Sequence, residues 1–456
     1  MRALTQQVVQ QLVSRASLMS DTETIIFGLA LCSFDPGPAL LRLTTARLRA
    51  TVVPPTQSRS HTSPFEDNSA IARGGHGHRT HRRASVPAPG LPSTGFAALG
   101  DPTDAECPLA VRALYSLAKL RHQMDTSTLN AFCRRLEDSP ACLSRMCAED
   151  VAYFLCALGL LSHHPGATVA VAAVGRLSDE LAACPRALCP RAIVEVLSSL
   201  ATLNFCPFFD PVAQEWPDEG DEHVSCRSAE AKTAVGLLIQ RFAEKAQQQA
   251  TREDLIRCLR ALAVVGAPQQ ACHQLDLMVS LISTGLVLDT PPSRSALADL
   301  HLLIELGNTP RAPRAAAAAA SVLAQRPALR SLAAAAFRAR TVSKRQMLGP
   351  LQGDVSSVLV SMGILHVRQM VSDDGGPIVA IAILDYGIAV EVEDGDCALR
   401  NVSRPCGYAL LHRRMVSSRG WRVVPVCSWE WDRCHTLHQR QQLLVSKLTA
   451  TVLPHA

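Results

Sequence analysis

The sequence predicts an α-helical repeat solenoid followed by a small C-terminal α/β domain. Three observations lead to this fold class. Apolar residues make up 48% of the 456 residues while aromatics reach only 4%, a leucine signature recurs at a nearly constant spacing, and strand-like runs replace the helical pattern after Ser356. The length allows about three domains at ~150 residues each. The composition excludes a wholly disordered chain and argues against an aromatic-rich β-sandwich.

The leucine signature, at positions i, i+3 and i+6, predicts stacked helix pairs over residues 105–345. Successive copies are 41, 42, 62 and 41 residues apart, and the long step holds an acidic insert with Pro and Gly near residues 215–230. Each unit reads as an apolar helix, a polar or Pro/Gly turn and a second helix. Such a pair cannot bury its apolar face alone, so neighbouring pairs must stack into a solenoid. The five copies start at Leu114, Leu155, Leu197, Leu259 and Leu300.

The first hundred residues divide into a helical part and a linker. Residues 1–50 carry an earlier copy of the signature at Ile26, which predicts another helical repeat. Residues 1–20 are basic and free of acids, a composition that also fits a mitochondrial presequence, and both interpretations stay open. Residues 51–104 contain seven prolines and a His/Arg cluster with little apolar periodicity, so we expect a disordered linker there.

Residues 346–456 have the pattern of an α/β domain. Two β-branched or apolar runs flank a four-residue turn that predicts a hairpin, and a basic helix precedes another valine-rich strand and a terminal helix. The expected elements are strands at 379–383 and 388–392, a turn at 384–387, a helix at 408–418 and a strand at 421–426.

Cysteine spacing and hydropathy argue against a disulfide-stabilised protein, a membrane-spanning protein and a zinc protein. None of the 16 cysteines forms a CxxC pair, and several lie inside apolar helical runs, which favours reduced, buried thiols over a disulfide framework. No run is long and apolar enough for a transmembrane helix, so no membrane is expected. The tightest group of potential metal ligands matches no common zinc spacing, and we expect neither metal nor cofactor. That group is Cys427, Cys434, His435 and His438.

Positive charge is concentrated in the second half of the chain. No acidic residue occurs between Glu305 and Asp354, an interval that holds eight Lys or Arg residues. From Cys397 onward, nine Lys or Arg residues face only two acids. This distribution predicts an anionic partner for the C-terminal half, although basic residues can also simply solubilise an alanine-rich helix.

Four segments of the α/β region together resemble the RAP domain, a family abundant in apicomplexan parasites and also found in organelle proteins of plants, algae and animals. They are LQGDVSSVLVSMGI, IVAIAILDYGIAVEVEDG, HRRMVSSRGWRVVPV and SWEW, in this order between residues 351 and 431. Members join this domain to helical repeats. The resemblance implies an α/β core of the restriction-endonuclease-like type and binding of organellar RNA in processing, stability or ribosome biogenesis.

A nuclease-like core raises the question of catalysis, because such enzymes hold a divalent metal with clustered carboxylates, usually beside a lysine. Three features depart from the family pattern: Ala380 replaces an aspartate, Ala398 replaces a histidine, and the EVDG motif reads EVEDG. No lysine lies near the carboxylates. We therefore expect a protein that is not an enzyme, with metal-dependent RNA cleavage as an alternative. The carboxylates of that alternative are Asp385, Glu391, Glu393 and Asp394.

Two groups of residues are the candidate RNA contacts. Arginines can neutralise phosphates, and a tryptophan beside them can stack on a base. In the α/β domain the candidates are Arg413, Arg414, Arg419, Trp421 and Arg422, and in the preceding basic helices they are Arg326, Arg330, Arg338 and Arg340.

The function expected from sequence is binding or stabilisation of mitochondrial rRNA or mRNA. Ribosomal proteins are expected as further partners, with the protein acting as a mitochondrial ribosome component or assembly factor. A plastid location stays open, as does the target RNA. The alternative outside RNA biology is a protein–protein scaffold that uses the solenoid groove for a partner helix.

Overall fold

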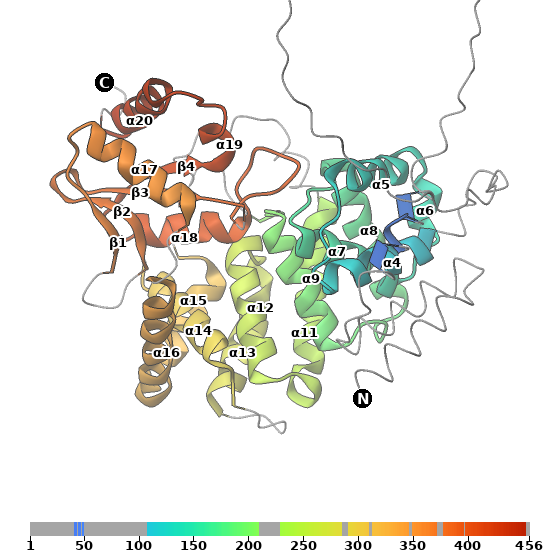
Figure 1. Ribbon diagram of the computed structural model, residues 1–456. Helices are drawn as coiled ribbons and strands as arrows, with labels where there is room; N and C mark the ends of the chain where they lie inside the picture. Colours follow the sequence, from blue (N-terminus) through green and yellow to red (C-terminus); the bar gives the residue numbers. More distant parts are fainter. Residues whose placement is uncertain are drawn as a thin grey trace, which may run out of the picture.

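The computed structural model shows a mostly helical protein with a small C-terminal four-stranded mixed sheet (Figure 1), as the sequence predicts at this level. The predicted linker at 51–104, the segment 1–20 and the greater part of the acidic insert lie outside the described residues. Residues described are 41–42, 44–46, 48–49, 107–208, 229–284, 291–309, 312–345, 349–371, 377–395 and 397–452.

Five helices that carry the leucine signature pack in chain order into one layer. Each contacts the next, and α16 (Pro327–Arg345) packs on the last of them. Their stripe leucines are buried, apart from the partly buried Leu120, because the i, i+3 spacing directs them to a single face. The five are α4 (Cys107–Lys119), α7 (Ala148–Leu161), α9 (Pro190–Thr202), α12 (Arg252–Val265) and α14 (Arg294–Gly307).

The helices between them form a second layer against the first. In this layer α5 contacts α8, α8 contacts α11, α11 contacts α13 and α13 contacts α15. Turn residues separate the two helices of a pair, as at the predicted Ser162 to Gly166 break between α7 and α8. The second-layer helices are α5 (Thr126–Asp138), α6 (Pro140–Ser144), α8 (Ala167–Ala183), α11 (Ala229–Gln249), α13 (Cys272–Thr284) and α15 (Arg314–Leu323).

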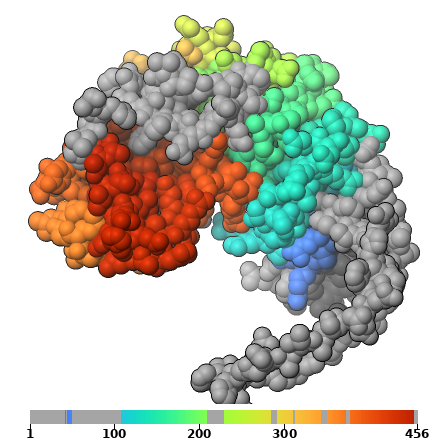
Figure 2. All heavy atoms as spheres, turned by 90° about the horizontal axis from the view of Figure 1, so that it is seen from above, coloured from blue at the N-terminus to red at the C-terminus, as the bar shows by residue number. Residues whose placement is uncertain are grey.

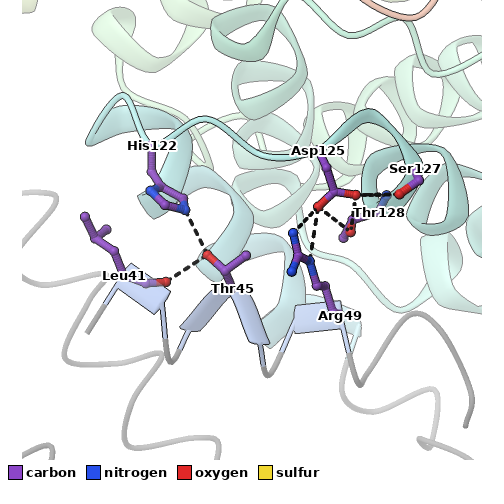
Figure 3. A network of polar contacts seen from close by, with 7 residues as sticks. All are labelled: Leu41, Thr45, Arg49, His122, Asp125, Ser127 and Thr128. Atoms are coloured by element: carbon purple, nitrogen blue, oxygen red, sulfur yellow. Dashed lines mark hydrogen bonds and ion pairs between the residues drawn. The ribbon is translucent and has the colours of Figure 1, made fainter. Parts of the chain in front are cut away.

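A helical segment from the predicted 1–50 unit lies against the turn between α4 and α5 (Figure 3). Its residues at 41, 45 and 49 share one helix face. Thr45 Oγ1 lies 3.0 Å from His122 Nε2, and Arg49 contacts the carboxylate of Asp125 at 2.5 Å. Asp125 also accepts from the Ser127 hydroxyl and, as the N-cap of α5, from the Thr128 amide, and these hydrogen bonds hold the pKa of Asp125 well below its usual range.

The sheet has the strand order β1–β2–β3–β4, in which only β3 and β4 run parallel. β2 (Val379–Ile383) and β3 (Ile388–Glu393) form the predicted hairpin, closed by a short helical turn and Gly387 in the left-handed conformation. β4 (Arg422–Cys427) returns beside β3 after α18 (Gly407–Ser417). The strand β1 (Val367–Met370) is absent from the sequence prediction because its short, polar run VRQM lacks the alternation of a typical strand.

Helices cover both faces of the sheet. On one face α17 (Pro350–Ser361) and α20 (Leu437–Val452) bury a hydrophobic core that includes Val390 and Trp431. On the other face α18 covers a smaller cluster that includes Ala389 and Val423. The short helix α19 (Ser428–Trp431) completes the domain. Because α18 is also in contact with α9 and α12, it lies between the sheet and the helical layers.

Candidate nucleic-acid interface

The two glutamates of β3 point at α18 and are held by internal partners. Glu391 and Glu393 are two residues apart, so they share one face of the strand. The Ala380 amide donates to Glu391 Oε1 at 3.3 Å, and His412 Nδ1 lies 3.3 Å from Glu391 Oε2. Both carboxylates are at least nine-tenths buried. The Glu391 and Glu393 side chains therefore belong to the contact between sheet and helix rather than to an open site.

Glu393 forms a buried ion pair with Arg413. Arg413 Nε donates to Glu393 Oε1 at 2.5 Å, and the thiol of Cys427 donates to the other oxygen at 3.5 Å. Burial, followed by the nearby Glu393 charge, raises the pKa of the Cys427 thiol. A buried pair of this kind keeps two opposite charges satisfied in the domain interior.

The four carboxylates of the nuclease alternative do not converge. Asp385 lies in the turn before β3, whereas Asp394 follows its last residue, and both are exposed. A six-residue strand separates them by roughly 20 Å at ~3.3 Å per residue. Among the described residues no cluster of His, Cys, Asp or Glu has the geometry to hold a metal ion. As the sequence predicts, Asp385 lies in the turn that precedes the strand, so it is at the opposite end of β3 from Asp394.

The helix α18 has two covered faces, which changes the role of its arginines. Arg413 faces the sheet and is only 7% exposed, so in this fold its guanidinium is an internal partner and not a surface contact. Arg414 is partly buried near Cys206 on the helical side, and burial lowers the pKa of its guanidinium. Of the two adjacent arginines proposed as RNA contacts, Arg413 is thus enclosed between the sheet and the helix, and Arg414 keeps only part of its surface exposed.

The α/β domain, orange to red in Figure 2, lies beside the cyan and green helices, and contacts between them fall at the C-terminal ends of α7, α9 and α14. Gly407 approaches the Ala201 carbonyl so closely that a Cβ atom would lie 2.2 Å from its oxygen. The guanidinium of Arg260 lies over the Tyr408 ring at 4.4 Å. These contacts join the start of α18 to α9 and α12.

Asn401 and Arg419 extend this docking to both sides. The Asn401 amide accepts from the His164 backbone N–H at 2.8 Å and donates to the His164 carbonyl at 2.6 Å. Arg419 contacts Glu305 at the end of α14 at 2.6 Å. Arg419, a candidate RNA contact by sequence, is thus paired within the protein.

The tryptophans of the domain belong mainly to its core. Trp431 is 1% exposed, with the Arg440 guanidinium 5.2 Å from its ring. Trp421 is half-buried and packs against the small cluster under α18, which leaves part of its surface open. Arg422 is exposed, and its guanidinium donates to the Tyr386 carbonyl.

Sequence analysis did not identify one exposed aromatic, Tyr386, which lies in the β2–β3 turn at one end of the sheet. The start of β3 and the start of β4 pair at Ile388 and Arg422, so the turn before β3 lies beside Arg422. In that turn Tyr386 is 57% exposed and Leu384 is 52% exposed. An aromatic in a tight hairpin turn is the signal that could have identified it, since a turn residue rarely packs into a core.

The basic helices before the α/β domain carry an exposed stripe. Arg326, directly before α16, is followed four residues later by Arg330 and eight residues after that by Arg338. At ~100° per residue the three fall within about a third of the helix circumference, over roughly 18 Å at ~1.5 Å per residue. All three are exposed, and within the described chain none has an ion-pair partner. We call these three residues the arginine stripe. Arg340 differs, because it contacts Asp299 at 2.6 Å.

The remaining potential metal ligands are separated as well. Cys427 is buried against Glu393, whereas His435 and His438 are exposed on the segment around the start of α20. Over the parts of the chain that the structure covers, no helix is sufficiently long and apolar to cross a lipid bilayer. A comparison with models of known protein families finds no match for this chain.

Proposed function

We propose that this protein binds RNA without cleaving it, as a helical-repeat protein of organellar RNA metabolism. In this proposal the two helical layers form a solenoid, and the C-terminal domain is RAP-like with a restriction-endonuclease-like core. Pairwise stacking of successive helices supports the solenoid. The mixed sheet with helices on both faces is compatible with that type of core.

The observation that carries the proposal is the arginine stripe. Three exposed guanidiniums without a described acidic partner lie along one helix, in a part of the sequence that has no acid between Glu305 and Asp354. Surface arginines on a folded protein usually lie among acids of opposite sign. A row of uncompensated charges suits a ligand with regularly spaced negative charges, and the phosphodiester backbone is such a ligand.

The end of the sheet at the β2–β3 turn supplies a second surface for RNA in this proposal. Tyr386 offers an exposed ring, and Arg422 beside it offers a cation for a phosphate. Stacking on an aromatic side chain is the usual way in which proteins hold unpaired RNA bases. The proposal therefore favours single-stranded RNA or loops over a regular duplex, whose bases are not open to stacking.

Glu391 and Glu393 are each held by partners inside the domain, which supports a role without catalysis. A metal-dependent nuclease needs open carboxylates around one ion, with room for water and substrate. In this fold the guanidinium of Arg413 occupies the position beside Glu393 where a cation would bind. The mitochondrial location, the ribosomal partners and the target RNA are part of the proposal through the resemblance described above.

The test is ultraviolet crosslinking and RNA sequencing with the tagged full-length protein in its native cells. A variant with Arg326, Arg330 and Arg338 changed to alanine is compared with a control that changes three exposed arginines of the first helices. These are Arg121, Arg134 and Arg186. Both variants lose the same net charge, so a general loss of electrostatic attraction affects them equally.

The expected result is a discrete set of organellar RNAs that is lost in the stripe variant and retained in the control. RNA at background level with the wild-type protein would overturn the proposal and favour the protein scaffold. Equal loss in both variants would contradict the role assigned to the arginine stripe.

A further inference from the structure

The first helices of the array contain two cysteines whose sulfur atoms almost touch. Cys107 begins α4 and Cys142 lies in α6, and their Sγ atoms are 2.7 Å apart. This is shorter than the ~3.5–4.0 Å of ordinary contacts between non-bonded heavy atoms. It is longer than the ~2.05 Å of a disulfide bond, so a small side-chain movement is enough to form one.

We propose that Cys107 and Cys142 are a redox-active pair that forms an intramolecular disulfide. Their side chains are enclosed by apolar residues, with exposed fractions of 4% and 0%. The two sulfurs lie 2.7 Å apart, so this pair is the exception that we propose to the expectation of reduced, buried thiols. The proposal is independent of RNA binding.

The reaction requires an oxidant, and a small-molecule disulfide such as glutathione disulfide supplies it. One cysteine thiolate attacks a sulfur of the oxidant, releases one glutathione thiolate and forms a mixed disulfide. The second cysteine thiolate then attacks the protein sulfur and releases the second glutathione. Two electrons pass to the oxidant, and the two cysteine protons go to solvent or to the released thiolates. Both sulfurs are buried, so the oxidant reaches them when this part of the helical layers opens locally.

Two other buried cysteines of the helical layers, Cys133 and Cys156, lack a second sulfur at such a short distance. Burial raises the pKa of Cys133 in α5 to about 12 and that of Cys156 in α7 to about 12 as well, which keeps both thiols protonated and poorly reactive. Within the described residues no sulfur is recorded within bonding reach of either. Cys133 is therefore the matched control, since it lies close in sequence and is equally buried.

The bond would fasten the start of α4 to α6 and close a loop that contains all of α5. A crosslink across such a loop stabilises mainly by restricting the unfolded chain. The same loop carries His122 and Asp125, which hold the N-terminal helical segment (Figure 3). Oxidation should thus raise the melting temperature of the intact protein.

The experiment equilibrates the full-length wild-type protein in glutathione redox buffers, traps free thiols by alkylation and maps peptides by mass spectrometry after trypsin digestion. Arg134 and Arg135 separate Cys133 from Cys142, so the two cysteines fall on different peptides. The expected product is a crosslinked pair of peptides that contain Cys107 and Cys142, together with a higher melting temperature that reduction reverses.

Two cysteine variants test the proposed disulfide independently of the peptide map. Cys142→Ser should abolish the redox-dependent change in melting temperature, and Cys133→Ser should retain it. If Cys107 and Cys142 stay alkylatable under oxidising buffer while exposed cysteines such as Cys184 form glutathione adducts, the proposal is wrong. A crosslink of either residue to Cys133 in comparable yield would also overturn it.

Discussion

At the scale of single residues, the clearest result concerns the charged groups between β3 and α18. The pair Glu393 and Arg413 has no exposed surface to offer a ligand, although sequence analysis treats one as a metal ligand and the other as a phosphate contact. Both interpretations depended on the residue type alone. The charge of a residue can be read from the sequence, whereas its enclosure by a second layer cannot.

Breaking this ion pair should affect stability and leave RNA affinity unchanged. Arg413→Met leaves the Glu393 carboxylate buried without its partner, so we expect a loss of about 3–5 kcal/mol in the free energy of unfolding. The double change Arg413→Met with Glu393→Met removes both charges and should be less destabilising than the single one. Chemical denaturation measures both. A single variant as stable as the wild type, with weaker RNA binding, would restore Arg413 as a surface contact.

His163 predicts a specific acid sensitivity. Its ring is fully buried under the 397–406 loop, neither ring nitrogen has a hydrogen-bond partner in the described structure, and burial, with smaller effects of His164 and Arg400, lowers its pKa to about 4. The unfolded chain, at the ordinary 6.5, binds the proton first, so stability falls as the pH drops from about 6.5 to about 4. At ~1.4 kcal/mol per pH unit the total is about 3 kcal/mol.

The pH dependence is measured by denaturant unfolding at a series of pH values. His163→Leu should flatten the curve between these two pH values, while the same change at the exposed His435 should not. Equal slopes for the wild type and His163→Leu would show that this ring does not titrate as its burial implies.

At the scale of elements, the sequence predicts helices and strands better than their contacts. The hairpin at β2 and β3 and the helix α18 follow directly from alternation and from the helical run around Tyr408. Periodicity could not predict that α18 lies between two layers, because its adjacent arginines are typical of a helix face exposed to solvent. The predicted turn at 384–387 and the strand after it did place Asp385 and Asp394 at opposite ends of that strand.

The close approach of Gly407 to α9 and α12 gives a direct test of domain docking. Gly407→Ala places a methyl group 2.2 Å from the Ala201 oxygen and 2.5 Å from the Val264 side chain, so α18 must move away from α9 and α12. We expect a loss of about 1–3 kcal/mol, which is typical of overpacking. The readouts are thermal unfolding and cleavage by a protease at the domain junction.

Gly353→Ala in α17 is the matched control. Nothing lies within 4 Å of its added methyl group, and alanine in a helix interior stabilises by about 0.5–1 kcal/mol relative to glycine. If Gly407→Ala behaves like this control, the α/β domain is not held by the close contact at the start of α18.

At the scale of the whole molecule, the α/β domain is docked on the helical layers, and the arginine stripe remains exposed. The contacts of Asn401, Tyr408 and Arg419 use polar groups of the α/β domain to cover the ends of first-layer helices. Three of the arginines that sequence analysis assigned to RNA have partners within the protein: Arg413 inside the α/β domain, Arg419 between this domain and α14, and Arg340 with Asp299. The arginine stripe and Arg422 are exposed.

The central claim is that the arginine stripe neutralises RNA phosphates, and the salt dependence of affinity tests it most directly. Fluorescence anisotropy with a short labelled single-stranded RNA gives the slope of log affinity against log salt for the wild type, the stripe variant and the Arg121, Arg134 and Arg186 control. Loss of three phosphate contacts at ~0.7 each should make the stripe variant's slope shallower by about 2, with the control unchanged. An identical slope for the stripe variant and the wild type would contradict the account.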